Sequence, residues 1–255
     1  MTQDLELFSP PVSSIMQFSS DSDGSVSPTS TAKGQVGVSF EGLAVDGTGN
    51  LYGGGLLSGS SPASKGQLEI LVYAPGVNGT ASPTRTIRGD STGLERFTQN
   101  SISGLAADSS GNVYVSSFLL KGGLVNPGIS VFPSTSNGDV APTKVITMTG
   151  INTPTPGQIA LDSAGNIYVA ASDPLAPGAI LIFASNSTGT VPPSSTLAGS
   201  ETTFDLVEGV AVDNAGNIYV SNASRTGAAS SVLEFSRVPP EMSLRFAASQ
   251  VQQQQ

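Results

Sequence analysis

The sequence predicts an all-β protein built from short antiparallel strands, and three observations support this. Charged residues make up only 11% of the chain while Gly, Ser, Thr and Pro are abundant, a composition typical of many short strands joined by many turns. No long amphipathic helical period is visible. One hairpin pattern also occurs four times along the 255 residues. A chain of this length can bury its core as a single all-β domain.

The repeated hairpin consists of an apolar strand, a tight turn and a second apolar strand. Its copies are GLAVDGTGNLYGG (42–54), GLAADSSGNVYVS (104–116), QIALDSAGNIYVA (158–170) and GVAVDNAGNIYVS (209–221). In each D-x-x-G-N turn the Asp carboxylate can accept backbone N–H bonds and the Gly can supply a positive φ. Calcium loops are the alternative, but one Asp per turn provides too few carboxylates.

A Tyr follows each of these turns at a fixed offset, at positions 52, 114, 168 and 219. Because the position recurs in every unit, we expect it in the core between units, with the phenol bonded to a backbone group.

A second element follows each hairpin, an apolar strand that ends on an aromatic residue. These strands end at Tyr73, Phe132, Phe183 and Phe235, and a fifth copy, SIMQF, ends at Phe18 before the first hairpin. We expect these aromatics in the core as well. Four of them are followed by a Gly six residues later and a Pro four residues after that: Gly24 and Pro28, Gly79 and Pro83, Gly138 and Pro142, Gly189 and Pro193. This spacing predicts a turn and the start of an outer strand.

Each unit of roughly 50 to 60 residues therefore holds four short strands, the size of one propeller blade. The sequence predicts a β-propeller of four-stranded antiparallel blades, with four full blades plus a partial one. The first unit lacks an inner pair of strands, which only DLELF or PEMSLRF could complete. Two closures stay open: a five-bladed ring with a composite blade, and a truncated six-bladed propeller.

The predicted organisation has three parts. Residues 1–13 are an N-terminal segment that can belong to a composite blade, residues 14–246 are the propeller domain, and residues 247–255 are a disordered Gln-rich tail.

The phrase GVAVDNAGNIYVSN followed by SVLEF resembles the NHL-type β-propeller repeat, a relative of the gluconolactonase-like and streptogramin-lyase-like six-bladed propellers. The resemblance covers about residues 14 to 237. It implies a propeller fold, but this architecture hosts lactonases, lyases, sensor domains and interaction scaffolds. The fold is therefore the part that the resemblance implies most directly.

Charge and residue usage narrow the possible partners and chemistries. Ten basic against 19 acidic residues give a net charge of −9, which repels nucleic acid and anionic membrane surfaces. No apolar run is long enough to span a bilayer. The absence of Cys and His excludes disulfides, thiol catalysis, imidazole metal ligands and His general bases.

Low charge with abundant Ser, Thr and Gly favours an extracellular or periplasmic location. We also expect the protein to be a monomer. MTQDLELFSPP lacks a basic region followed by an apolar run, so we expect the leader to lie outside this chain.

Two functional readings stay open. The first is a non-catalytic scaffold that binds a protein or small-molecule ligand, favoured because the recurring residues have structural roles; it has no catalytic residue and no cofactor. The second is a lactonase-like or lyase-like enzyme that depends on a divalent cation at the channel mouth. Glu41 and Glu208 precede two inner strands; the resemblance implies a cation ligand there, and paired carboxylates suit calcium. Variable loops converge at this mouth, where we expect any ligand, opposite the D-x-x-G-N turns.

Three further motifs have plainer interpretations. Arg88-Gly89-Asp90 spells an integrin-binding tripeptide, which arises easily by chance. The pairs Glu95 with Arg96 and Asp205 with Glu208 lie in segments that join blades, where solvated surface charge is the expectation.

Overall fold

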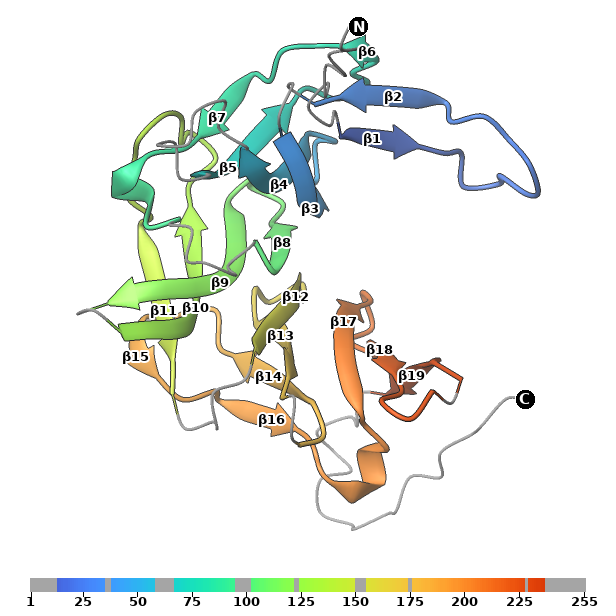
Figure 1. The fold of residues 1–255 in the computed structure, drawn as a ribbon, viewed down its shortest axis with the longest axis vertical. Helices are drawn as coiled ribbons and strands as arrows, with labels where there is room; N and C mark the ends of the chain where they lie inside the picture. The colour runs from blue at the N-terminus through green and yellow to red at the C-terminus, as the bar shows by residue number, and fades with distance from the viewer. Residues whose placement is uncertain are drawn as a thin grey trace, which may run out of the picture.

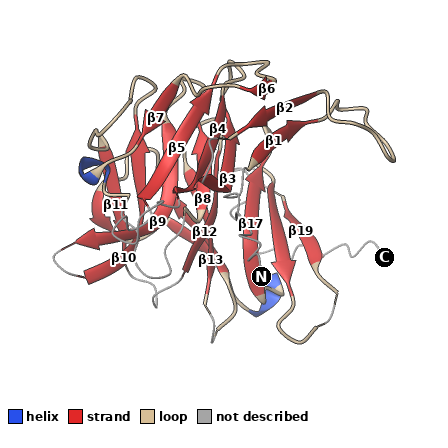
Figure 2. Cartoon of the chain, turned by 45° about the horizontal axis from the view of Figure 1, so that its top comes forward, coloured by secondary structure: helices blue, strands red, loops and turns tan. Residues whose placement is uncertain are grey.

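The computed structural model describes residues 13–34, 38–57, 67–94, 102–121, 124–149, 155–173, 176–227 and 229–236. Within these ranges the chain forms β-strands and two short 3-10 turns, η1 (Asp90–Thr92) and η2 (Ser200–Thr202), so this part is all-β as predicted (Figure 2). No helix among these residues has the length and apolar character needed to cross a membrane. The predictions for the N-terminal segment and the Gln-rich tail concern residues outside the described ranges.

The strands form five sheets, numbered here in chain order. Sheet 1 contains β1 (Ser14–Gln17), β2 (Ser30–Lys33) and β6 (Gly79–Thr80). Sheet 2 contains β3 (Val38–Val45), β4 (Leu51–Leu57), β5 (Gln67–Tyr73) and β7 (Arg85–Ile87). Sheet 3 contains β8 (Gly104–Ala107), β9 (Val113–Lys121), β10 (Leu124–Phe132), β11 (Lys144–Met148) and β15 (Gly189–Val191). Sheet 4 contains β12 (Thr155–Leu161), β13 (Ile167–Ser172), β14 (Ala179–Phe183) and β16 (Ser195–Leu197). Sheet 5 contains β17 (Leu206–Val212), β18 (Ile218–Ala223) and β19 (Ser231–Phe235).

The repeated hairpins form the first two strands of sheets 2 to 5, and all of them are antiparallel as predicted. The aromatic-ended segments form the third strands β5, β10, β14 and β19, and the fifth copy forms β1. Sheet 1 contains only a third and an outer strand of its own, which matches the predicted partial unit. In sheet 5 the position of an outer strand follows residue 236, outside the described ranges.

The sheets are arranged around a common centre, with β3, β8, β12 and β17 nearest to it (Figure 1). A separate apolar core fills each of the four interfaces between successive sheets. Sheets 1 and 5 lie at the two ends of this arc (Figure 1), and no strand pairing among the described residues joins them. The described architecture is therefore propeller-like.

The repeated Gly after each third strand links neighbouring sheets, which the spacing alone did not reveal. Gly79 and Gly189, each with a φ of 74°, begin β6 and β15, which pair in parallel with the outer strand of the preceding sheet. Gly138 forms a similar parallel bridge to Ile87. The outer strand itself begins later, at the twelfth residue after the aromatic. The Gly therefore forms the predicted turn, and the Pro four residues after it lies two residues before the outer strand.

Candidate functional site

The Asp of each D-x-x-G-N turn accepts hydrogen bonds at both carboxylate oxygens. In the first turn Oδ1 of Asp46 accepts the backbone N–H groups of Thr48 at 2.9 Å and Asn50 at 3.0 Å. Its Oδ2 accepts the Asn50 amide at 2.7 Å and the Tyr52 hydroxyl at 2.8 Å. The corresponding donors surround the other three turn aspartates, Asp108, Asp162 and Asp213. The predicted structural role of this Asp is confirmed.

These contacts favour the ionised form of three turn carboxylates, those of Asp46, Asp162 and Asp213. Burial alone would raise the pKa of Asp46, but hydrogen bonds from Asn50 and its neighbours outweigh burial and hold this pKa well below its ordinary value. The pKa values of Asp162 and Asp213 are also lowered, chiefly by hydrogen bonds from the Asn of the same turn. Burial, together with the nearby Asp46 carboxylate, raises the pKa of Tyr52 to about 12.

The repeated tyrosines lie in the cores between sheets wherever a following sheet is described. Tyr52, Tyr114 and Tyr168 are buried, whereas Tyr219 on sheet 5 is only half-buried. The phenol donates to the Asp of its own turn, so the expected backbone partner was wrong, except that Tyr52 also reaches the carbonyl oxygen of Gly111 at 3.3 Å.

Glu41 and Glu208, the predicted metal ligands, occupy equivalent positions in β3 and β17. Each lies where the pairing register with the next strand shifts, between Phe40 and Gly42 and between Val207 and Gly209. Such a β-bulge can redirect a side chain away from the ladder, and both glutamates are exposed. Among the residues that the structure describes, no group of three or more Asp or Glu side chains gathers as a metal centre. The calcium site stays a prediction.

The charged residues of the joining segments are engaged in the fold. Arg225 pairs with Asp205 at 3.3 Å and donates its backbone N–H to the same carboxylate at 2.8 Å, so Asp205 is bound to Arg225 instead of forming a pair with Glu208. Glu95 and Arg96 lie outside the described residues.

The Arg-Gly-Asp tripeptide is built into the interface between sheets 2 and 3. The Arg88 guanidinium lies 3.2 Å from the fully buried Glu69 carboxylate, and a Cβ on Gly89 would lie 2.4 Å from the Asp139 side chain. An adhesion motif needs the Arg to reach a partner, so this geometry argues against adhesion.

A basic side chain crosses two of the sheet interfaces at one repeated position, the twelfth residue after the aromatic of the third strand, which we call the rim position. The rim residues are Ser30, Arg85, Lys144 and Ser195. Arg85 donates to the Ser136 carbonyl oxygen of sheet 3 at 3.1 Å and lies 6.0 Å from the Tyr52 ring centroid. Lys144 donates to the Ser185 carbonyl oxygen of sheet 4 at 2.6 Å.

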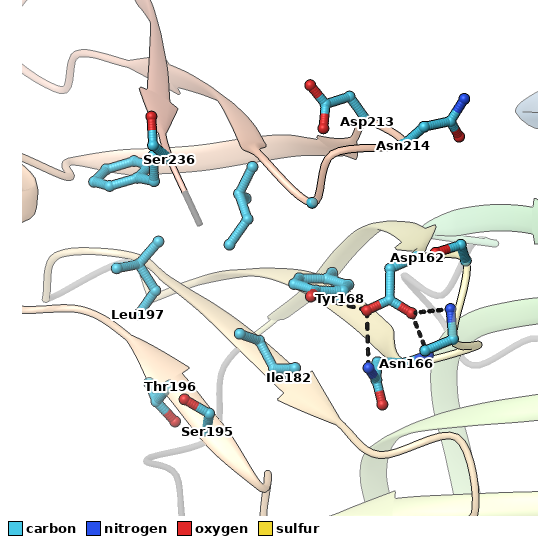
Figure 3. A pocket seen from close by; sticks show the side chains of 15 residues that line it. Asp162, Asn166, Tyr168, Ile182, Ser195, Thr196, Leu197, Asp213, Asn214 and Ser236 are labelled. Carbon is cyan, nitrogen blue, oxygen red and sulfur yellow. Dashed lines mark hydrogen bonds between the residues drawn. The ribbon is translucent and has the colours of Figure 1, made fainter. Parts of the chain in front are cut away.

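The next interface along the chain, between sheets 4 and 5, contains an open cavity of about 390 Å³. Its walls come from the D-x-x-G-N turns of both sheets, from β16 and from the end of β19. Figure 3 shows Asp162, Asn166 and Tyr168 on one side and Ser195 on β16. The turn that carries Asp213 and Asn214 lies opposite, with these two side chains pointing away from Asp162. We call this space the sheet 4/5 cavity.

No single motif predicts this cavity, and the signal for it is a difference between units at the rim position. The rim residue is a long cation in sheets 2 and 3 but the short Ser195 in sheet 4. The cavity lies at the end of the sheets that carries the D-x-x-G-N turns, opposite the mouth where the sequence predicts a ligand. Residues 58–66, 95–101 and 150–154 of the mouth loops lie outside the described part.

Neither a protein-family model nor a curated protein sequence matches the chain. Solved structures do resemble it in fold. A protein of unknown function from Bacteroides caccae is 10% identical with a TM-score of 0.40, and the match covers 82% of each chain. The major allergen Mala s 1 of Malassezia sympodialis is 15% identical with a TM-score of 0.47, covering 77% of this chain and 59% of the allergen.

A third similar structure is a gluconolactonase from Xanthomonas campestris, 14% identical with a TM-score of 0.39, covering 76% of this chain and 71% of that one. These similarities concern the fold alone. By its own sheets and cores, the described part of this chain is an all-β, propeller-like protein of repeated units.

Proposed function

We propose that this protein is a non-catalytic, propeller-like binding scaffold that acts outside the cytoplasm. The observation that supports it most is the state of the recurring polar groups. Each turn Asp has both oxygens occupied by donors of its own turn. A carboxylate held in this way is poorly placed to transfer a proton or to complete a metal shell. What remains for a ligand is surface and the sheet 4/5 cavity.

Binding at the cavity is tested by titrating isotope-labelled protein with small probes of different chemistry while following backbone amide NMR shifts. A suitable panel contains n-butylguanidine, n-butylamine, glucose and valerate. We expect at least one probe to shift the amides of residues 162–168 and 213–217 and to leave the distant turn at Asp46 unchanged. If no probe shifts these amides, the cavity is not a binding site.

The enzyme alternative is tested by hydrolysis of gluconolactone in the presence and absence of calcium. The scaffold proposal expects the rate to equal that of buffer in both conditions. Calcium-dependent turnover that is lost in the Glu41→Gln, Glu208→Gln double variant would replace the scaffold with a lactonase-like enzyme.

One specific observation keeps this alternative open: both glutamates occupy the same bulge position of an inner strand. Oxygen ligands of this kind suit calcium. Calorimetric titration with calcium of the parent and of the double variant tests the pair. Absence of binding by the parent, or equal binding by the variant, removes the site.

We further propose that the units are NHL-type repeats and that the five sheets belong to a five-bladed ring, with a truncated six-bladed propeller as the alternative. Support comes from the repeated hairpin of sheets 2 to 5, the third strand of all five sheets and the rim position of sheets 1 to 4. Location outside the cytoplasm is supported by the low charge content of 11%. Fractionation of source cells with an antibody tests it, and recovery in the cytosolic fraction would contradict it.

A further inference from the structure

The sheet interfaces supply an internal comparison for the cavity. In the interface between sheets 2 and 3, Arg85 places its guanidinium 6.0 Å from the ring centroid of Tyr52 and donates to the Ser136 carbonyl oxygen at 3.1 Å. In the next interface the ammonium group of Lys144 donates to the Ser185 carbonyl oxygen at 2.6 Å. Two successive interfaces therefore hold a basic side chain that comes from the same rim position.

The sheet 4/5 interface has equivalent walls and lacks the rim cation. Tyr168 corresponds to Tyr52, and Asp162 corresponds to Asp46. The rim residue is Ser195, whose side chain is too short to cross to sheet 5. No side chain of β16 takes the place of Arg85 at this interface, which contains the sheet 4/5 cavity.

The lining suits a positively charged group on an apolar stem. The carboxylate of Asp162 lies beside Tyr168 on one wall of the cavity, and the turn that contains Asp213 forms part of the opposite wall. Both carboxyl groups have lowered pKa values, so they remain negative at neutral pH. None of the fifteen lining residues is basic. A cation near the Asp162 carboxylate and the Tyr168 ring is stabilised electrostatically.

The remaining contacts explain why a stem fits as well as a charge. Ile182, Leu197 and Ile218 contribute apolar surface, and Ser195 and Ser236 contribute hydroxyl groups. Alkyl ammonium and alkyl guanidinium groups combine three or four methylenes with a charged end, as in Lys and Arg themselves.

We propose that the sheet 4/5 cavity binds an alkyl guanidinium or alkyl ammonium group, which takes the place that Arg85 and Lys144 fill in the preceding interfaces. This inference rests on the proposed scaffold function and names the chemistry of its ligand. The group can belong to a free small molecule or to a Lys or Arg side chain of a partner protein.

The test is calorimetric titration of the full chain near pH 7 with n-butylguanidine and n-butylamine, with valerate and n-butanol as probes of equal stem length. We expect one site that takes the cations and binds valerate and butanol at least about tenfold more weakly. A second experiment compares n-butylguanidine with a short peptide that contains one Arg and has acetylated and amidated termini. Tighter binding of the peptide indicates a protein partner, and equal or weaker binding indicates a small molecule.

Two variants make the test specific to the cavity. Ser195→Arg restores the rim cation and should abolish binding, whereas the matched Ser195→Ala should bind as the parent does. Arg85→Ser removes the cation from the sheet 2/3 interface and should raise the stoichiometry from one site to two; Lys144→Ser is the second choice if Arg85→Ser does not fold.

Several outcomes overturn the proposal. Unchanged binding by Ser195→Arg places the ligand elsewhere. A further variant, Arg237→Gln, tests a residue that follows Ser236 and lies outside the described residues. If this variant binds the cations and the parent does not, Arg237 is the natural occupant of the cavity. If glucose or valerate shifts the cavity amides and the cations do not, the ligand class is wrong while the scaffold function stands. If no probe binds and gluconolactone is hydrolysed, both proposals fail.

Discussion

At the scale of single residues, the Asp of each D-x-x-G-N turn holds the two strands of its hairpin together. It joins two backbone N–H groups, an Asn amide and a Tyr hydroxyl through one carboxylate. The pKa values of Asp46, Asp162 and Asp213 are lowered in the folded chain. A depressed folded pKa contributes stability that is present above the unfolded value and is lost as the pH falls toward the folded value.

We therefore expect the urea midpoint to fall steadily as the pH is lowered from about 4 to about 2. Asp162→Asn removes one of these groups and should flatten this dependence. Asp23→Asn, at an exposed position, should leave it as in the parent. If the midpoint does not change over this pH range, protonation of these carboxylates does not alter the stability of the fold, and the prediction is wrong.

The Gly of the same turn is required by backbone conformation and by space. Gly111 has a φ of 78°, and a Cβ there would lie 3.1 Å from the Cβ of Ser134 and 3.2 Å from the Tyr52 hydroxyl. Gly111→Val should cost on the order of 1 to 3 kcal/mol of unfolding free energy, measured by urea denaturation. Ser25→Val, at an exposed site, should be nearly neutral. Equal midpoints for the two variants would contradict this account of the turn.

At the scale of strands, the hairpins and third strands could be predicted because each leaves a local signal. A period of two, a Gly turn and an aromatic end are all visible within one unit. The parallel links β6 and β15 could not be predicted, since their partners lie in another unit. The long pairing of β9 with β10, which reaches from Phe132 and Val113 to Leu124 and Lys121, is likewise not indicated by the repeated pattern.

In the candidate site, too, the features that depend on contacts between separate strands could not be predicted from local sequence. Glu41 and Glu208 were predicted to precede the inner strands, but they lie within β3 and β17. The bulge that they share was not predicted, because it depends on the register with the next strand. The cavity lies between two units, and its lining includes the short rim residue Ser195, so a comparison of the rim positions is needed to suggest it.

An ion pair joins β5 to the segment that follows β7 and leads to a further prediction. Burial raises the pKa of Glu69, although the Arg88 guanidinium partly offsets this, and the Oε1 atom of Glu69 has no hydrogen-bond partner. A carboxyl with a raised folded pKa favours the fold below its unfolded pKa and loses that contribution as the pH rises. At neutral pH the ionised form therefore opposes folding.

Glu69→Gln should raise the urea midpoint at pH 7, and the gain should vanish near pH 4. Arg88→Gln should lower the midpoint at pH 7, because it leaves a buried charge without its partner. A lower midpoint for Glu69→Gln at pH 7 would mean that the ion pair contributes more than burial costs.

At the scale of the whole molecule, the two ends of the arc expose residues that are core residues elsewhere. Met16 and Phe18 on sheet 1 are 55% and 48% exposed, and Val232 on sheet 5 is 73% exposed. In sheet 2 the corresponding residues, Leu71, Tyr73 and Ile70, are buried at 0%, 1% and 0% exposure. Apolar surface of this kind is normally covered.

Met16 and Val232 occupy strand faces that would meet if the arc closed into the five-bladed ring. Because the chain has no Cys, the two cysteines of a Met16→Cys, Val232→Cys double variant are its only thiols, and a disulfide between them reports ring closure. We expect this intramolecular disulfide to form under mild oxidation in dilute protein and to be seen as faster migration on a non-reducing gel. Two cysteines form a disulfide only when their Cα atoms come within about 7 Å. The control Ser25→Cys, Val232→Cys, with one cysteine in the exposed turn beyond β1, should stay reduced. If both double variants stay reduced, the truncated six-bladed arrangement is favoured. If the Met16→Cys, Val232→Cys variant forms disulfide-linked dimers, a second copy of the chain covers the open ends.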